Sequence, residues 1–172
     1  DSIIEYQLQE FSTALEWVLD EEHPKGYDYF YDQIVSMGEL LSTAIIAAYL
    51  QLQNTQVEWV DVRDILKTDD NHRDAGILFA KSADLVKERM HHLYKTKRVI
   101  ITQGYIGSTE ENTVTTLGRE GSDYSAALFA NMLGAESVTI WKDVPCLLNG
   151  DPKIFPNTIP IYEISYHEVI EM

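Results

Sequence analysis

Apolar residues recur at helical spacing from the start of the chain. They are Ile4, Leu8, Phe11, Leu15 and Val18. This pattern predicts an amphipathic helix over residues 2–20, closed by the His23-Pro24-Lys25-Gly26 turn. A second helical pattern runs from about residue 28 to residue 52, and Gly38 within it is interpreted as a kink or a point of close packing.

Short runs typical of strands alternate with helical stretches further along the chain. Strands are predicted over residues 56–61, 98–104, 112–117 and 137–141, and helices over residues 82–95 and from the turn at 118–123 to about Leu133. Parallel strands need crossover connections of about a dozen or more residues, usually helices. We therefore predict an α/β fold with a mainly parallel sheet sandwiched by helices, in which the polar segment 61–73 is the most mobile part.

Composition limits the class of protein. The chain has 172 residues, 45% of them hydrophobic, which suits one domain or a large fragment with one sizeable core. Its 13 basic and 28 acidic residues give a net charge of −15, which disfavours nucleic acids and anionic membranes as partners. We predict a soluble cytoplasmic protein for three reasons. The chain has a single cysteine, Cys146, and no leader is recognised. No apolar run approaches the roughly 20 residues that a membrane span needs.

Both ends of the chain predict an internal piece of a longer protein. The first residues enter a helical pattern without a start methionine. At the other end, Ser165 and Glu168 form a predicted capping box, yet the chain stops at Met172 after little more than one helical turn.

Residues 115–127 have the richest chemistry, with the sequence Thr-Thr-Leu-Gly-Arg-Glu-Gly-Ser-Asp-Tyr-Ser-Ala-Ala. A glycine-flanked turn leads into a helix, whose first backbone N–H groups and positive dipole end can bind an anion. Arg119 adds a planar fork suited to carboxylate or phosphate. The residues alone leave a plainer alternative open, in which Ser122 or Asp123 is only a helix cap.

This stretch resembles the aspartokinase signature Thr-Thr-Leu-Gly-Arg-Gly-Gly-Ser-Asp-Tyr. Segments 35–42, 101–108 and 140–153 match the same family in order, so the resemblance covers roughly residues 28–172. It implies that residues 1–172 are part of an aspartokinase catalytic domain of the amino acid kinase fold. The implied reaction is phosphorylation of L-aspartate by ATP to 4-phospho-L-aspartate, with Mg²⁺ as cofactor, on the route to lysine, threonine and methionine. A homo-oligomer is implied for the full-length enzyme.

The resemblance also implies a set of aspartate-binding residues. Glu39, Arg119 and Ser122 correspond to residues that bind aspartate. Asp123 corresponds to the carboxylate that organises cationic groups around the transferring phosphoryl. These residue types suit the chemistry, because a dianionic amino acid needs donors for its carboxylates and an acid for its ammonium. Asp123 need not act as a base, since the attacking carboxylate is ionised at neutral pH.

The implied nucleotide site is less regular. Asp143 would contact the nucleotide, and Lys142 and Lys153 would supply cations near its phosphates, with solvated surface as the alternative for both lysines. No metal-ligating residues are predicted, and His72, His91 and His92 are interpreted as surface residues.

The sequence also departs from the family. Glu120 replaces a glycine of the signature, Lys142 a threonine, Cys146 a glycine, Leu148 a tyrosine and Lys153 an arginine. The family's N-terminal Lys-Phe-Gly-Gly strand and loop, the C-terminal part of its catalytic domain and its regulatory domains are not found in these 172 residues, so we expect the chain alone to be inactive. Two alternatives remain: another amino acid kinase, such as a glutamate or carbamate kinase, or a non-catalytic relative that binds amino acids or nucleotides.

Overall fold

The computed structural model describes residues 2–19, 25–143 and 146–171. The chain divides into two compact units, Asp1–Val138 and Thr139–Met172. The predicted turn at residues 23–26 lies partly outside the described residues.

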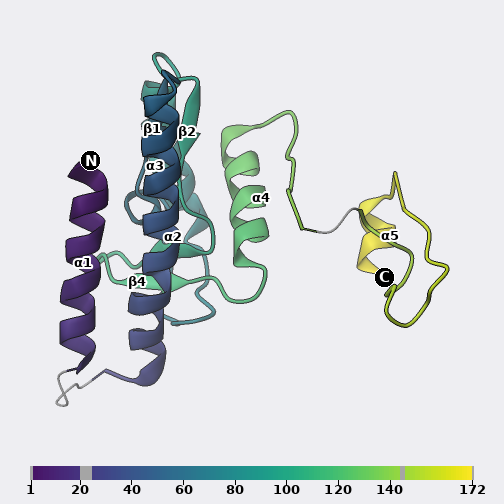
Figure 1. The fold of residues 1–172 in the computed structure, drawn as a ribbon, viewed down its shortest axis with the longest axis horizontal. Helices are drawn as coiled ribbons and strands as arrows, with labels where there is room; N and C mark the ends of the chain where they lie inside the picture. The colour runs from purple at the N-terminus through teal and green to yellow at the C-terminus, as the bar shows by residue number, and fades with distance from the viewer. Residues whose placement is uncertain (1, 20–24, 144–145, 172) are drawn as a thin grey trace. The chain divides into compact units, whose positions relative to one another are not determined.

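Two helices pack together in the first unit, as the apolar spacing predicts (Figure 1). They are α1 (Ser2–Leu19) and α2 (Tyr27–Leu52). The buried residues of α2 follow helical spacing along one face: Asp32, Ser36, Met37, Leu40, Ala44 and Ala47. Gly38 lies outside this face, and a Cβ atom there would meet nothing within 4 Å, so it is not a point of close packing.

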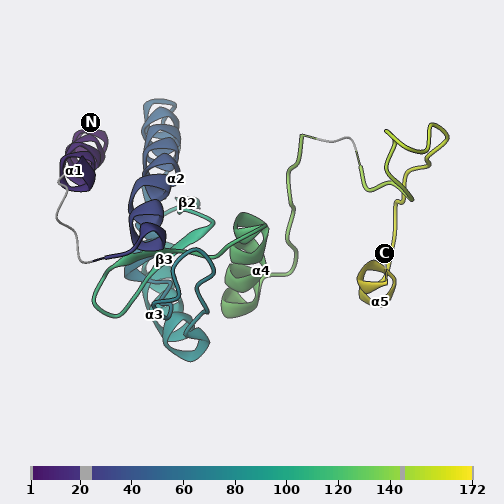
Figure 2. The ribbon, with the colours of Figure 1, turned by 90° about the horizontal axis from the view of Figure 1, so that it is seen from below.

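The strands form two pairs. β1 (Val57–Trp59) and β2 (Val99–Ile101) are parallel and connected through α3 (Phe79–Leu93), which confirms the predicted α/β crossover. β3 (Ile106–Ser108) and β4 (Val114–Thr116) are antiparallel. In Figure 2, α2 and α3 lie on opposite sides of the strands of the first unit, so helices cover both faces of the strand layer.

The segment after β1 corrects one prediction. Residues 61–73 were expected to be the most mobile part, but they contain a short 3₁₀ helix, η1 (Val62–Asp64), and contribute to the core. Val62 and Leu66 are fully buried. Lys67 is also buried, and its Nζ donates to the backbone oxygen of Arg63 and to the side chains of Ser108 and Asn112. Loss of hydration lowers the pKa of Lys67.

Helix α2 corrects a second prediction. By length and composition it could cross a bilayer, although the sequence was interpreted as having no such run. Its buried face carries Asp32, whose carboxylate is hydrogen-bonded inside the protein. A one-sided buried stripe with a bonded acid is typical of a helix packed on a core.

Gln7 on α1 gives a stability prediction. Its side chain is fully buried, and neither amide atom has a hydrogen-bond partner among the described residues. Because an unsatisfied buried amide costs free energy, we expect Gln7→Met to raise the free energy of unfolding by about 1 kcal/mol in urea titrations. Gln9→Met, at an exposed position of the same helix, is the control and should change it by less than about 0.5 kcal/mol. A destabilised Gln7→Met would mean that the amide has a partner, such as a bound water.

The second unit is mostly irregular. The strand predicted over residues 137–141, at its border, is wrong, because these residues form no strand and Trp141 is 89% exposed. A strand needs a neighbour for its backbone hydrogen bonds, and no described residue pairs with this segment. Helix α5 (Tyr166–Ile170) opens with the predicted capping box of Ser165 and Glu168.

Candidate functional site

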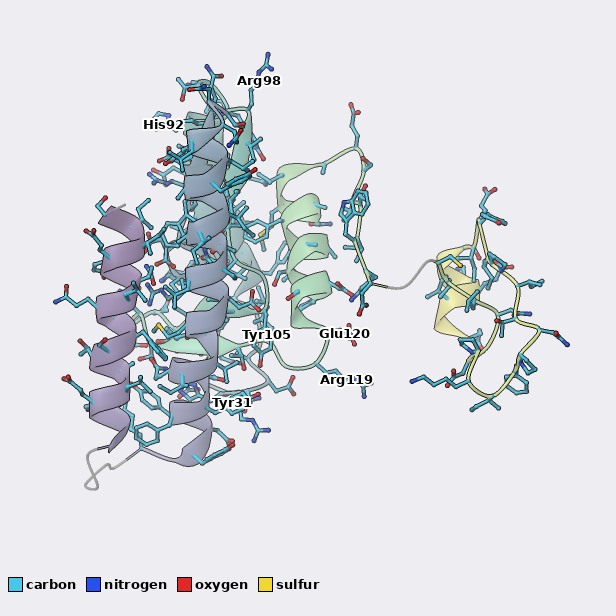
Figure 3. The ribbon with its side chains drawn as sticks, viewed as in Figure 1. Tyr31, His92, Arg98, Tyr105, Arg119 and Glu120 are labelled. Carbon is cyan, nitrogen blue, oxygen red and sulfur yellow. The ribbon has the colours of Figure 1, made fainter. Side chains whose placement is uncertain are left out.

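The signature residues form a turn between β4 and the helix α4 (Gly121–Leu133). Two residues of the turn have left-handed backbone conformations, Gly118 with φ +76° and Glu120 with φ +57°. Arg119 lies between them and is exposed. Figure 3 shows Arg119 and Glu120 side by side at this turn, with Tyr105 nearby.

A second segment of the resemblance packs directly on this turn. A Cβ atom on Gly104 would lie 3.1 Å from Ser122 Cα, and one on Gly121 would lie 2.7 Å from Tyr105 Cδ2. Tyr105 N donates to Ser125 Oγ over 3.0 Å. Both glycines lie at points of close approach, and segments 101–108 and 115–127 pack directly against each other.

The start of α4 shows whether Ser122 or Asp123 is only a helix cap. The N-cap residue is Glu120, which makes no side-chain capping bond, so neither Ser122 nor Asp123 is the cap. The amides of Gly121 and Tyr124 donate to the carbonyls of Gly118 and Glu120. Within the described residues the amide of Ser122 has no acceptor, so the helix start can still bind an anion.

Glu39 belongs to α2, a helix that packs against β4. Its side chain is half-buried, and the loss of hydration raises the pKa of its carboxyl group. Among the residues that the structure describes, Glu39 has no ion-pair partner, and a raised carboxyl pKa in such a position suits a residue that meets the ammonium group of a ligand. That Glu39 and Arg119 bind one ligand stays a prediction.

The Glu39 carboxylate should make stability depend on pH. Its pKa is above the ordinary 4.5, so the ionised form costs folding free energy at neutral pH, and this cost vanishes below about pH 4.5, where both states bind the proton. We expect Glu39→Gln to melt at a higher temperature than the parent chain at pH 7, with the difference shrinking toward pH 4. The exposed Glu88→Gln is the control, and a gain that is equal at both pH values would contradict the explanation.

The three residues predicted to bind the nucleotide belong to the second unit. Lys142, Asp143 and Lys153 are all exposed. The amide of Lys153 donates to Asp151 Oδ1 over 2.9 Å. Their role in nucleotide binding stays a prediction.

One histidine departs from its interpretation as a surface residue. His91 and His92 are exposed, but the His72 side chain is only 15% exposed and its Nδ1 donates to Asp32 Oδ2 over 2.8 Å. Among the described residues no group of three His, Cys, Asp or Glu side chains could hold a metal ion. Sequence reasoning missed Asp32, although its position on the apolar face of α2 was a readable signal.

The left-handed conformation of Glu120 explains why the signature has glycine at this position. A non-glycine residue there is strained by its Cβ atom. We expect Glu120→Gly to raise the free energy of unfolding by about 1 kcal/mol in denaturant titrations. Glu120→Ala removes the carboxylate but keeps the Cβ atom, so it should give little of this gain. Equal gains from both variants would mean that charge, and not backbone strain, sets the cost.

The comparison with protein families fits this fold and turn. The family model described as "Amino acid kinase family" matches residues 4–172. The chain therefore belongs to the amino acid kinase family, and the predicted fold is confirmed.

Within that family, the similar proteins are aspartokinases. The chain is 40% identical over 141 residues to lysine-sensitive aspartokinase 3 of Escherichia coli, covering 82% of this chain and 31% of that protein. It is 32% identical over 148 residues to the aspartokinase of Chlamydia pneumoniae, covering 86% of this chain and 33% of that protein. The structure of E. coli aspartokinase III in complex with aspartate and ADP has a TM-score of 0.85 at 36% identity, covering 98% of this chain and 37% of that one. The chain thus spans about a third of these relatives.

Proposed function

We propose that residues 1–172 are part of an aspartokinase catalytic domain. In the full-length protein this domain transfers the terminal phosphoryl group of ATP to the side-chain carboxylate of L-aspartate. The product is 4-phospho-L-aspartate, the first intermediate toward lysine, threonine and methionine. The observation that carries this proposal is the turn at 118–123, where Arg119 adjoins a helix start with an available amide in a chain that resembles aspartate-binding enzymes.

The residues of the turn would divide the chemistry of aspartate binding. Arg119 supplies two parallel N–H donors to one carboxylate, and Ser122 adds its amide and hydroxyl. Glu39 would receive the ammonium group, which would also restore its pKa toward the ordinary value.

Phosphoryl transfer needs mainly positioning and charge stabilisation. Asp123, in the first turn of α4, would hold cationic groups around the transferring phosphoryl. Mg²⁺ would neutralise charge on the β- and γ-phosphates, and it is commonly held by those phosphates with only one or two carboxylates.

The remaining parts of the proposal concern the nucleotide and the setting. Lys142, Asp143 and Lys153 would bind ATP, and all three are accessible for it. We further propose a cytoplasmic homo-oligomer without nucleic-acid or membrane partners. The net charge of −15 disfavours nucleic-acid and anionic membrane partners, and the single cysteine fits a reducing compartment. The homo-oligomer is proposed only from the resemblance to aspartokinases.

An acceptor assay of the full-length protein tests the proposal. With Mg-ATP, hydroxylamine should trap an acyl phosphate from L-aspartate and little or none from L-glutamate or N-acetyl-L-glutamate. Preference for either of the latter would overturn the substrate assignment. No acyl phosphate from any acceptor, together with no binding of millimolar Mg-ATP in calorimetry, would favour a non-catalytic relative. The 172-residue chain alone should release no ADP above background.

A further inference from the structure

A buried carboxylate on α2 connects three parts of the first unit. Asp32 is fully buried and accepts four hydrogen bonds. The donors are His72 Nδ1, the amide of Arg73, and both the amide and the hydroxyl of Thr116, at distances of 2.8, 3.1, 3.1 and 2.7 Å. The catalytic chemistry proposed above does not use this group.

The position of Asp32 in the sequence relates it to the aspartate site. It precedes Glu39 by seven residues on α2, about two helical turns, so the two lie on the same side of one rigid helix. Its partner Thr116 is the last residue of β4 and precedes Arg119 by three residues. The Asp32–Thr116 contact therefore joins the helix of Glu39 to the turn of Arg119.

The loop around Arg73 supports the same turn from another side. A Cβ atom on Gly118 would lie 2.8 Å from Asp74 Oδ1 and 3.2 Å from the backbone oxygen of Arg73. The Arg73 guanidinium lies over the ring of Tyr31 at 4.8 Å and pairs with Asp28, so α2 also holds this loop. Asp32 thus fixes both the strand that enters the turn and the loop that packs on Gly118.

We propose that Asp32 is a positioning residue for aspartate binding. By bonding Thr116 and Arg73 it sets the place of the Arg119 turn relative to Glu39. A buried carboxylate is expensive unless it is fully hydrogen-bonded, so this geometry tolerates little displacement. The inference rests on the proposed aspartokinase function, because it concerns the two residues assigned to the ends of the substrate.

A neighbouring contact offers a matched control. Gln33 Nε2 donates to the backbone oxygen of Val114 over 3.0 Å, which is a second bond between α2 and β4. Val114 begins β4, away from the turn, and the Gln33 side chain is not part of the Asp32 cluster. Loss of this bond loosens the same interface without releasing Thr116.

The test measures Michaelis constants of the full-length enzyme. Thr116→Val removes the hydroxyl with little change in shape, and we expect the KM for L-aspartate to rise at least about tenfold, as for loss of a hydrogen bond to a charged group. The KM for ATP should change less than about twofold, and Thr116→Ser should restore the aspartate KM. Gln33→Met should leave both constants near the parent values. Melting temperatures identify which variants are folded. If Thr116→Val does not fold, Asp32→Asn takes its place, and the same rise in the aspartate KM is expected.

Two results would overturn the inference. One is a lower kcat in folded Thr116→Val and Asp32→Asn with an unchanged aspartate KM. The other is an equal rise in the aspartate KM for Gln33→Met, which would make the cluster a general element of the fold. Failure of the proposed function looks different, because the parent enzyme itself would then not phosphorylate aspartate.

Discussion

Replacing Arg119 by methionine should lower kcat/KM of the full-length enzyme for L-aspartate by about a hundredfold or more. The guanidinium is the charged fork at the turn, and methionine keeps much of its length without its donors. The loss should appear mainly as a higher aspartate KM, since Arg119 is proposed to contact the substrate in both the ground state and the transition state. Initial rates over a range of aspartate at saturating Mg-ATP measure it.

The control for this variant is Arg98→Met. Arg98 is also exposed, and Figure 3 shows it at the opposite end of the first unit from Arg119. It should leave kcat/KM within about twofold of the parent enzyme, as expected for a surface cation away from the site. A comparable loss in both variants, or none in Arg119→Met, would remove Arg119 from the site.

The second large effect is expected at Asp123. Asp123→Asn keeps the size of the side chain and removes its charge, so cationic groups around the transferring phosphoryl lose their anchor. We expect kcat to fall by about a hundredfold, with the aspartate KM within about threefold of its parent value. Steady-state kinetics at saturating ATP and aspartate give this ratio.

Asp84→Asn provides the matched control, because Asp84 is an exposed carboxylate on α3. It should have kcat close to that of the parent. If Asp123→Asn kept most of its kcat, Asp123 would be a structural residue of the first turn of α4, and the proposed phosphoryl-transfer role would fail.

The helices could be predicted from the sequence because their apolar periodicity is strong. The bounds of α1 and α2 fall within about two residues of the prediction, which is the usual uncertainty of helix ends. The irregular segment 61–73 was misjudged because its polar composition hides a few apolar residues. Val62, Ile65 and Leu66 bury the first part of the segment, since burial depends on where a side chain points and not on the average polarity of the segment.

Strand predictions depend on partners that local sequence does not reveal. Residues 137–141 have a strand-like composition but no neighbouring strand among the described residues. Residues 112–117 have a similar composition, and 114–116 among them form β4 because β3 lies opposite them. The β-propensity of both segments is the same kind of signal, and only long-range pairing separates them.

The candidate site was predictable where it depends on one segment. The turn at 118–123 and the helix after it could be predicted from glycine, arginine and the apolar pattern. The packing of Gly104 against Ser122 and the hydrogen bonds from Thr116 to Asp32 could not, because they join segments distant in sequence. The sequence shows that Glu120 replaces a glycine of the signature, but not what this replacement costs. The backbone shows it, because position 120 has the left-handed conformation that favours glycine.

A crystal structure of the full-length protein with L-aspartate and ADP would test the central claim most directly. We expect one aspartate to lie between Arg119 and Glu39. One of its carboxylates should lie about 3 Å from the Arg119 guanidinium, and its ammonium about 3 Å from the Glu39 carboxylate. An aspartate bound elsewhere, or Arg119 and Glu39 on opposite sides of the enzyme, would contradict the account.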